Sequence, residues 1–257
     1  SVKVQDQVVV IGYGTAAKRD LTGSIVKISG KEVADRPNTN PISSLQGKVA
    51  GLSVVNSGTP GKAPDIRIRG TISIGSVTPL YVVDGVFNDN IDYINPNDIE
   101  SIEILKDPSS LAIFGVKGAA GVIAITTKRA RTGQVVINLN TSYGFKKLVD
   151  KIELADAETF KTLFEEEKAN LNTPIPPFDY TPWTANTDWI DAVTRTGNFS
   201  ASNLSVSGST DRNKFTMGIG YTFDEGLIRH EKLQKYLLSF NDEFKLSKGI
   251  KVGINFN

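Results

Sequence analysis

Hydrophobic and polar residues alternate along several stretches in the second half of the chain. Residues 135–145 carry apolar or aromatic side chains at most odd positions, with small or polar ones between them. The same period of two recurs over residues 215–223, 236–246 and 252–256. Such alternation predicts β-strands with one apolar and one polar face. A weaker stretch, residues 199–208, changes parity at Asn203 and predicts a strand with a β-bulge there.

The first half has shorter and more varied elements. Asn40-Pro41 supplies a helix N-cap and a first-turn proline, which predicts a helix over residues 42–50 that stops at a glycine. Asp84-Gly85 is a turn signal after an apolar run. A short helix is predicted over residues 107–115. Strands are predicted at residues 23–28, 52–55, 65–69, 80–83, 99–105 and 121–127, which indicates a compact α+β unit over residues 23–130.

The alternating stretches fit two architectures. An antiparallel sheet with one wet face alternates in this way, and so do the strands of a membrane β-barrel. The links at 209–213 and 246–249 are tight, whereas those at 146–197 and 224–232 are long, and the first long link holds a predicted helix over residues 155–169. Up-and-down strands would place both tight turns at one end and both long loops at the other, as outer-membrane barrels do.

Aromatic residues near the predicted strand ends point the same way. They lie at Tyr143, Phe145, Phe199, Tyr221, Phe223 and Tyr236 toward the long loops, and at Phe215 and Phe244 toward the tight turns. Two such girdles are typical of a transmembrane barrel. Five strands over residues 131–257 cannot close around the preceding unit, so the sequence predicts a truncated barrel and a chain that is part of a longer protein.

Composition removes several function classes. Lys and Arg number 29 and Asp and Glu number 28, so a net charge of +1 gives no attraction to nucleic acid. The absence of cysteine excludes thiolate metal sites, and the single histidine, His230, leaves little room for a histidine metal site or a Ser-His-Asp triad. No catalytic residue, metal site or cofactor is predicted, and no apolar run reaches the roughly 18 residues of a spanning helix.

An apolar run also lies close to residue 1. Val8-Val9-Val10-Ile11 follows a polar lead-in and precedes Gly12-Tyr13-Gly14, after which residues 15–22 are small and charged. The run is predicted to be a short strand held on a flexible tether, with residues 1–22 forming a separate segment. The alternative is that it forms the first strand of the compact unit.

Longer motifs identify a family. The stretches that carry the resemblance are Asp84-Gly85-Val86, residues 94–107 (INPNDIESIEILKD), residues 112–115 (AIFG) and residues 118–128 (GAAGVIAITTK). Their order resembles the plug domain of a TonB-dependent outer-membrane transporter. Residues 6–14 (DQVVVIGYG), 18–23 (KRDLTG), 187–189 (TDW) and 203–208 (NLSVSG) are similar to the SusC/RagA-like branch. The resemblance covers the chain from about residue 5 onward.

The resemblance implies an architecture and a set of partners. The fold would be an α+β plug domain followed by antiparallel strands of a transmembrane barrel, of the roughly 22-stranded type in the full protein, in the outer membrane of a Gram-negative bacterium. The apolar run would be the TonB box, which hangs into the periplasm and adds as a strand to TonB, itself driven by the inner-membrane ExbB/ExbD motor. The box residues would be Asp6, Gln7, Val8, Val9, Val10 and Ile11.

The resemblance also implies contacts between the plug and the barrel wall. Arg67 and Arg69 share a strand face, and Lys106 follows the Ile-Glu-Ile stretch. In the family such basic residues pair with glutamates of the barrel. Lys106 stands where many members have arginine, so its contact would be a point charge rather than a bidentate fork. A solvated strand face is the alternative for the two arginines.

Three polar loops, at residues 58–64, 71–78 and 87–93, correspond to plug apices that face the substrate. The residues predicted to face it are Gly58, Thr59, Gly61, Ser73, Ser76, Asn88, Asp89, Asn90 and Asp92. Their side chains suit sugar hydroxyls or peptide groups, although any polar loop uses the same residue types.

The predicted function is TonB-dependent import of a nutrient through the plugged barrel, together with a SusD-like surface lipoprotein. Members of the branch take up oligosaccharides or oligopeptides, and an oligosaccharide is the first expectation here. Three alternatives remain: a siderophore or cofactor receptor of the same superfamily, a soluble β-rich module for adhesion or glycan binding, and an enzyme such as a glycosidase.

Overall fold

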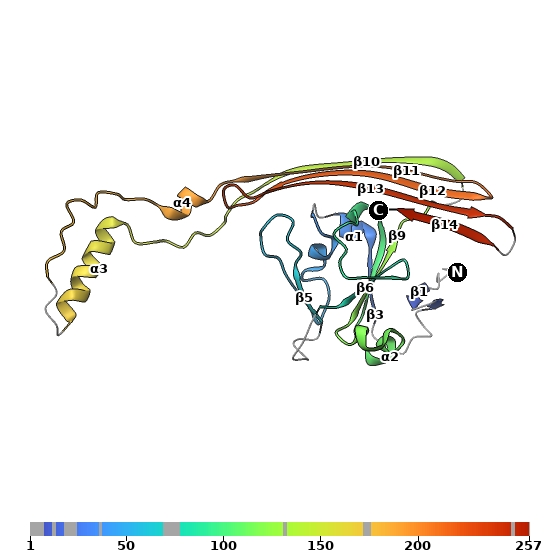
Figure 1. Ribbon diagram of the computed structural model, residues 1–257, viewed down its shortest axis with the longest axis horizontal. Helices are drawn as coiled ribbons and strands as arrows, with labels where there is room; N and C mark the ends of the chain where they lie inside the picture. The colour runs from blue at the N-terminus through green and yellow to red at the C-terminus, as the bar shows by residue number, and fades with distance from the viewer. Residues whose placement is uncertain are drawn as a thin grey trace, which may run out of the picture.

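The structure is a computed structural model. It describes residues 8–11, 14–17, 25–35, 38–68, 78–130, 133–171, 176–247 and 250–256, with the side chains of residues 8–17 and 134 left out. Two bodies pack against each other (Figure 1). We call residues 25–130 the plug unit and the long-stranded sheet that lies across it the wall sheet.

The plug unit is built around one mixed sheet. Among the described residues its strands lie in the order β3-β8-β9-β6-β7, with β6 and β9 parallel and the other neighbours antiparallel. Their bounds are β3 Ile25–Ser29, β6 Leu80–Val83, β7 Val86–Asn88, β8 Ile99–Leu105 and β9 Val122–Thr127. A separate hairpin joins β4 (Leu52–Val55) to β5 (Asp65–Ile68). All six predicted strands of this unit are therefore present.

The helices of the plug unit are short. They are α1 (Gly30–Ala34), η2 (Pro41–Leu45), η3 (Pro96–Asp98), α2 (Pro108–Leu111) and η4 (Ala112–Gly118). The Asn40 side chain caps η2 as predicted, accepting a hydrogen bond from the Ile42 amide at 2.9 Å. The predicted helix over 42–50 is wrong in length, because Gly47 adopts a φ of +74° that a right-handed helix cannot include.

The core of the plug unit is almost entirely aliphatic. Ile42, Leu45, Ile99, Ile102 and Ile125 are each at most 1% exposed. Strand β8 lies between β3 and β9, and all its residues except Glu100 are buried, because its side chains join both hydrophobic clusters of the plug unit. Its buried charge, Glu103, lies opposite Lys27 of β3, and their side chains form an ion pair of 2.9 Å.

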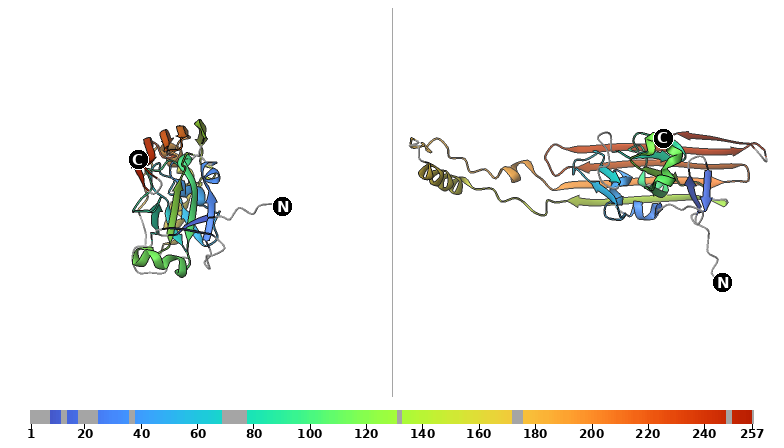
Figure 2. Two further views of the ribbon diagram at one scale, coloured as in Figure 1. Left: turned by 90° about the vertical axis from the view of Figure 1, so that its right-hand side faces the viewer. Right: turned by 90° about the horizontal axis from the view of Figure 1, so that it is seen from below.

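The wall sheet is an antiparallel meander in which each strand pairs with its sequence neighbours. Its strands are β10 (Gly133–Lys146), β11 (Gly197–Ser209), β12 (Asn213–Glu225), β13 (Lys232–Lys245) and β14 (Lys251–Phe256). The predicted alternation is confirmed: Ile137, Leu139, Ile219 and Leu238 are more than half exposed, and they alternate along their strands with residues that face the plug unit. The opposite face lies on the plug unit (Figure 2). No helix in the described part of the chain is long and apolar enough to cross a membrane.

Strand β11 corrects one prediction. Its register with β10 and β12 runs through Asn203 without a shift, so the expected bulge is absent there, and the irregularity lies between Gly133 and Val136 of β10. The parity changes because Phe199 points to the same face as Asn203, where it is 4% exposed and lies beside the ammonium of Lys146. Phe199 is thus an inward aromatic and does not belong to the outer girdle.

The link between β10 and β11 forms an arm, residues 147–196, that extends past the end of the wall sheet (Figures 1 and 2). It carries α3 (Ala157–Asn170) and α4 (Trp189–Val193). Phe164, Phe178 and Tyr180 form edge-to-face ring contacts on it, with centroids 5.9 and 4.8 Å apart. The arm and the loop between β12 and β13 mark the long-loop end of the sheet, opposite its tight turns.

Candidate functional site

The functional site we consider is the interface between the plug unit and the inner face of the wall sheet. Its centre is η3, where the Asn95 side chain caps the turn by accepting a bond from the Asn97 amide at 3.0 Å. The cap leaves the Asn95 Nδ2 group turned to the wall, where it donates to Oδ1 of Asn203 on β11. Gly220 of β12 makes room for this pair, since a Cβ there would lie 2.8 Å from both side chains.

A second hydrogen bond to the wall sheet is made at Asp98, the last residue of η3. The Ser239 hydroxyl of β13 donates to Oδ2 of Asp98 at 2.9 Å. Burial raises the pKa of the Asp98 carboxyl, and the bond from Ser239 and the charge of Lys128 oppose that shift only in part. Gly218 of β12 has no side chain at this point, where a Cβ would lie 2.4 Å from the Ser239 oxygen. The wall thus approaches the plug unit most closely at two glycines.

Lys235 of β13 makes a third contact nearer the long-loop end. Its ammonium donates to the Thr39 carbonyl at 3.1 Å. Asp92 lies close by and accepts a bond from the Asn40 amide group at 2.8 Å. Burial and the charge of Asp92 raise the pKa of Tyr81 to about 12, so the phenol stays neutral. At the tight-turn end, Arg129 of the plug unit pairs with Glu243 of the wall at 3.3 Å.

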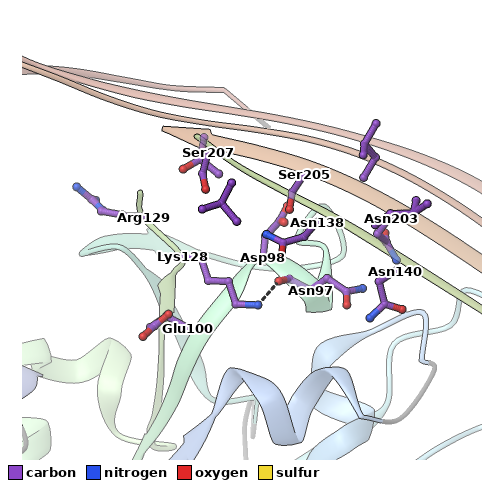
Figure 3. Close-up of a pocket in the computed structure, with 14 residues that line it drawn as sticks. Asn97, Asp98, Glu100, Lys128, Arg129, Asn138, Asn140, Asn203, Ser205 and Ser207 are labelled. Atoms are coloured by element: carbon purple, nitrogen blue, oxygen red, sulfur yellow. Dashed lines mark hydrogen bonds between the residues drawn. The ribbon is translucent and has the colours of Figure 1, made fainter. Parts of the chain in front are cut away.

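Several cavities lie at this interface, and two of them share η3 as a border. Cavity A has a volume of about 500 Å³ and lies between η3, the end of β9 and strands β10 to β12 (Figure 3). Cavity B, about 280 Å³, lies between α1, η3 and strands β10 to β13. Asn97, Asn140 and Asn203 line both. The interface is therefore a polar seam of amides and hydroxyls and not an apolar core.

The predicted TonB box lies partly outside the described residues. Asp6 and Gln7 are not described, while Val8–Ile11 form strand β1 and pair with β2, Gly14–Ala17. Strand β1 is not part of the plug sheet, so the alternative that it starts that sheet is not what the structure shows. The tether expected from residue 15 is a strand as far as Ala17, because these residues complete the hairpin.

The basic residues predicted to contact the barrel have other partners here. Arg67 pairs with Asp65 of its own strand at 3.1 Å, and both side chains are about half exposed. Lys106 donates to the Ala50 carbonyl at 3.1 Å. Arg69 lies outside the described residues. Pairing of Arg67, Arg69 and Lys106 with barrel glutamates stays a prediction.

The predicted substrate-facing loops are divided. The loop with Gly58, Thr59 and Gly61 is exposed and lies at the long-loop end, where a Cβ on Gly61 would lie 3.1 Å from Leu233 of β13. Pro60 lies equally close to the Gly226 position, beside the start of the β12–β13 loop. Ser73 and Ser76 are outside the described residues. This loop therefore lies at the long-loop end of the plug unit, and its contact with substrate stays a prediction.

In the loop at residues 87–93, two of the predicted substrate-facing residues have hydrogen-bond partners within the plug unit. Asn88 donates to the Val86 carbonyl at 2.9 Å and accepts from the Tyr93 hydroxyl at 2.9 Å. Asp92 holds Asn40, as described above. Asp89 and Asn90 are exposed and remain candidates for substrate contact.

Sequence reasoning missed the residues that join the two bodies. Asn95, Asp98, Asn203, Lys235 and Ser239 belong to no predicted site. The sequence contains one signal on each side of the interface. In the plug unit, Asn95-Pro96 is a helix-cap sequence, and in the wall sheet, Gly218 and Gly220 at successive inward positions of β12 indicate a close approach of another segment. The sequence does not show which plug residue contacts which wall strand, because the bonded residues are 108 to 196 positions apart.

Comparison with known proteins supports this geometry. Residues 17–122 match the model of the TonB-dependent receptor plug domain. TonB-dependent receptor P26 of Formosa agariphila is 39% identical over 268 residues, covering 98% of this chain and 26% of that protein. TonB-dependent receptor SusC of Bacteroides thetaiotaomicron is 36% identical over 251 residues, covering 93% of this chain and 24% of that protein.

A solved structure shows the same fold. The RagAB peptide importer in its open-open state superposes with a TM-score of 0.78 at 30% identity, over 97% of this chain and 31% of that chain. This chain spans about a quarter of the length of the curated relatives it matches. The predicted plug domain followed by antiparallel strands is confirmed by these matches and by the fold. The chain belongs to the SusC-like TonB-dependent receptors.

Proposed function

We propose that this chain is the plug and wall part of an importer that moves an oligosaccharide across the outer membrane, using energy delivered by TonB. One observation carries the proposal: a single sheet presents apolar side chains on one face and a polar, plug-bearing surface on the other. Such a sheet suits the boundary between lipid and a polar lumen. A plug bonded to the lumen face blocks free diffusion, so transport requires an input of energy.

The cargo is proposed to be a neutral oligosaccharide, with an oligopeptide as the second candidate. Amide and hydroxyl side chains at the interface suit sugar hydroxyls, which both donate and accept hydrogen bonds. The likeness to the RagAB peptide importer favours the second candidate. A siderophore would be the cargo if the protein followed the wider superfamily.

TonB is proposed to bind the segment Asp6 to Ile11. Strand β1 is paired on one edge with β2, and within the described residues its other edge has no ladder partner. An open strand edge adds readily to a strand of another chain. The hairpin lies near the tight-turn end of the wall sheet, away from the arm (Figure 1), which is the position that a periplasmic contact requires.

A SusD-like lipoprotein is proposed as the partner at the opposite end. The arm and the exposed plug loop with Gly58 both lie at the long-loop end of the wall. A surface partner that delivers cargo has to reach that end. We propose no cofactor, metal or catalytic role for the chain.

The test uses the full-length transporter in its outer membrane and a peptide of residues 1–15. The peptide should bind the periplasmic domain of TonB, and Val9→Pro or Val10→Pro should abolish binding, because proline removes a ladder donor and the two positions cover both edges of the strand. The same substitutions should stop import of labelled oligosaccharides without changing their binding at the cell surface. An unchanged import rate in both variants would refute the assignment of the box.

Cargo class is decided in the same cells. Labelled neutral oligosaccharides, oligopeptides and ferric siderophores are offered separately, and the proposal expects energy-dependent uptake of the first. Uptake of peptides alone would replace it with the second candidate. A protein whose gel mobility did not shift on boiling would be a soluble module and would end the transport reading.

A further inference from the structure

Cavities A and B lie one after the other along the strand direction. Cavity B spans the level of Ser142 and Ala201 and reaches Lys235, near the long-loop end. Cavity A spans the level of Val136 and Ser207 and reaches Arg129, near the tight-turn end. Six residues of rise separate the two ends of this path on β10, which corresponds to about 20 Å. The cavities thus follow the direction in which cargo has to travel.

On strands β10 to β12 the wall of this path is neutral, whereas β13 contributes the ammonium of Lys235 to cavity B. From Ser142 to Val136 on β10, and at the paired levels of β11 and β12, the inward positions hold only Ser, Asn, Val, Ala, Thr and Gly. Charged side chains return at both ends, as the Lys146–Asp224 pair at the long-loop end and Lys214 at the tight-turn end. In cavity A the plug side presents Asp98, with its hydrogen bond to Ser239, and also Glu100, Lys128 and Arg129, so that these four charges sum to zero. In cavity B the negative charge of Asp35 on the plug side is balanced by the positive charge of Lys235 on the wall.

Ligand-binding pockets of this volume are usually lined by apolar side chains with a few polar groups. Cavities A and B have the opposite character, because amides and hydroxyls dominate the wall side. Such a surface exchanges hydrogen bonds with water or with a hydroxyl-rich solute at little net cost. It favours passage over tight binding.

One bond stands between the two cavities. Asn203 lines both of them, whereas its partner Asn95 lines cavity B alone, so the Asn95–Asn203 amide pair lies at their boundary. Both partners are neutral, and each can form an equivalent bond with a sugar hydroxyl. A passing sugar therefore replaces the bond it breaks, whereas an unpaired ionic group would be desolvated without compensation.

We propose that the seam between η3 and strands β10 to β12 is the route by which a neutral, hydroxyl-rich cargo crosses this part of the transporter, with Asn95–Asn203 as its gate. The proposal rests on the proposed function and adds to it the path and the selecting chemistry. Cargo passes between the plug and this wall when the amide pair opens.

The test fills the seam in the full-length transporter. Asn140→Trp places an indole on the inward face where both cavities meet, and Ile137→Trp is the matched control on the outward face of the same strand, at a residue that lines neither cavity. Energy-dependent uptake of labelled neutral oligosaccharides should fall about tenfold or more in the first variant, because the added bulk has no space to occupy once cargo enters. Uptake in the control should stay within about twofold of the unmodified protein.

A reversible cross-link provides a second test that does not depend on correct folding of the tryptophan variant. Residues 1–257 contain no cysteine, so Asn95→Cys with Asn203→Cys introduces the one cysteine pair of this part of the protein, placed across the gate. Oxidised cells should lose uptake, and a reductant should restore it. Each single-cysteine variant is the control and should import equally well in both conditions.

The outcomes separate this proposal from the broader one. Uptake by the unmodified protein together with equal uptake by Asn140→Trp and by the oxidised pair overturns the route and leaves the import function standing. No uptake of any neutral oligosaccharide by the unmodified protein overturns the proposed cargo instead. Loss of uptake in both locked forms, with normal binding of oligosaccharide at the cell surface and normal binding of TonB, supports the route.

Discussion

Replacing Gly218 by alanine should loosen the contact between η3 and the wall. A Cβ at this position would lie 2.4 Å from the Ser239 hydroxyl and 3.1 Å from the Asp98 carboxylate. The hydroxyl has to rotate away, which breaks its 2.9 Å bond to Asp98. A hydrogen bond to a charged group contributes about 1.5–3 kcal/mol. Because Asp98 is only partly buried and water can replace part of the bond, we expect a loss of about 1–2 kcal/mol, or roughly a 5- to 30-fold change in the opening equilibrium.

Hydrogen exchange measures this opening directly. In the full-length transporter, a peptide containing Asn95 to Asp98 should exchange about 5- to 30-fold faster in Gly218→Ala, since exchange follows the local opening equilibrium. Ser239→Ala removes the same bond without the clash and should give a similar change. Gly144→Ala is the matched control, because a Cβ on that glycine of β10 meets nothing within 4 Å. Equal exchange in Gly218→Ala and Gly144→Ala would refute the close approach on which the seam depends.

Three further predictions concern the same interface and the wall. Burial raises the pKa of Asp98, so the docked state binds its proton more tightly than the open state. The protection factors of η3, corrected for the intrinsic effect of pH on exchange, should therefore increase as the pH falls toward that pKa and decrease as it rises, and Asp98→Asn should abolish this pH dependence of the protection factors. Lys235→Met removes the bond to the Thr39 carbonyl and should lower the free energy of local opening at residues 38–40 by about 1–2 kcal/mol, measured as faster hydrogen exchange. Lys232→Met, at the exposed start of β13, should leave exchange at residues 38–40 unchanged. Leu139→Arg places a charge on the apolar face and should destabilise the assembled protein by about 2–4 kcal/mol, which would lower the fraction whose gel mobility shifts on boiling. Asn140→Arg, on the polar face, should assemble normally. Equal assembly of the two variants would contradict a lipid-facing surface.

The elements that the sequence predicted well have local causes. The alternation of residues 135–145 became β10 because most outward side chains are apolar and most inward ones are small or polar. Asn40 capped η2, and Asp84-Gly85 formed a turn with φ values of +48° and +87°. In each case the residues that decide the structure lie within a few positions of one another.

The failures have causes that lie farther apart. Phe199 looked like an outward aromatic until its strand acquired partners that fixed its face. The Asn95–Asn203 and Asp98–Ser239 bonds join positions 108 and 141 residues apart, and the local sequence around one partner does not indicate where the other lies. The basic residues were placed by resemblance alone, and the structure gives Arg67 and Lys106 partners nearby.

The arm between β10 and β11 has a consequence for the order in which the wall forms. A short turn joins β11 to β12, whereas residues 147–196 separate β10 from β11, a difference of roughly four doublings in loop length that costs about 2.5 kcal/mol more in closure entropy. Pairings between close neighbours form faster than distant ones. The β11–β12 hairpin should therefore form first, β13 should pair with it next, and β10 should pair with β11 late. The strand nearest the plug unit in sequence would then be the last to join its neighbour.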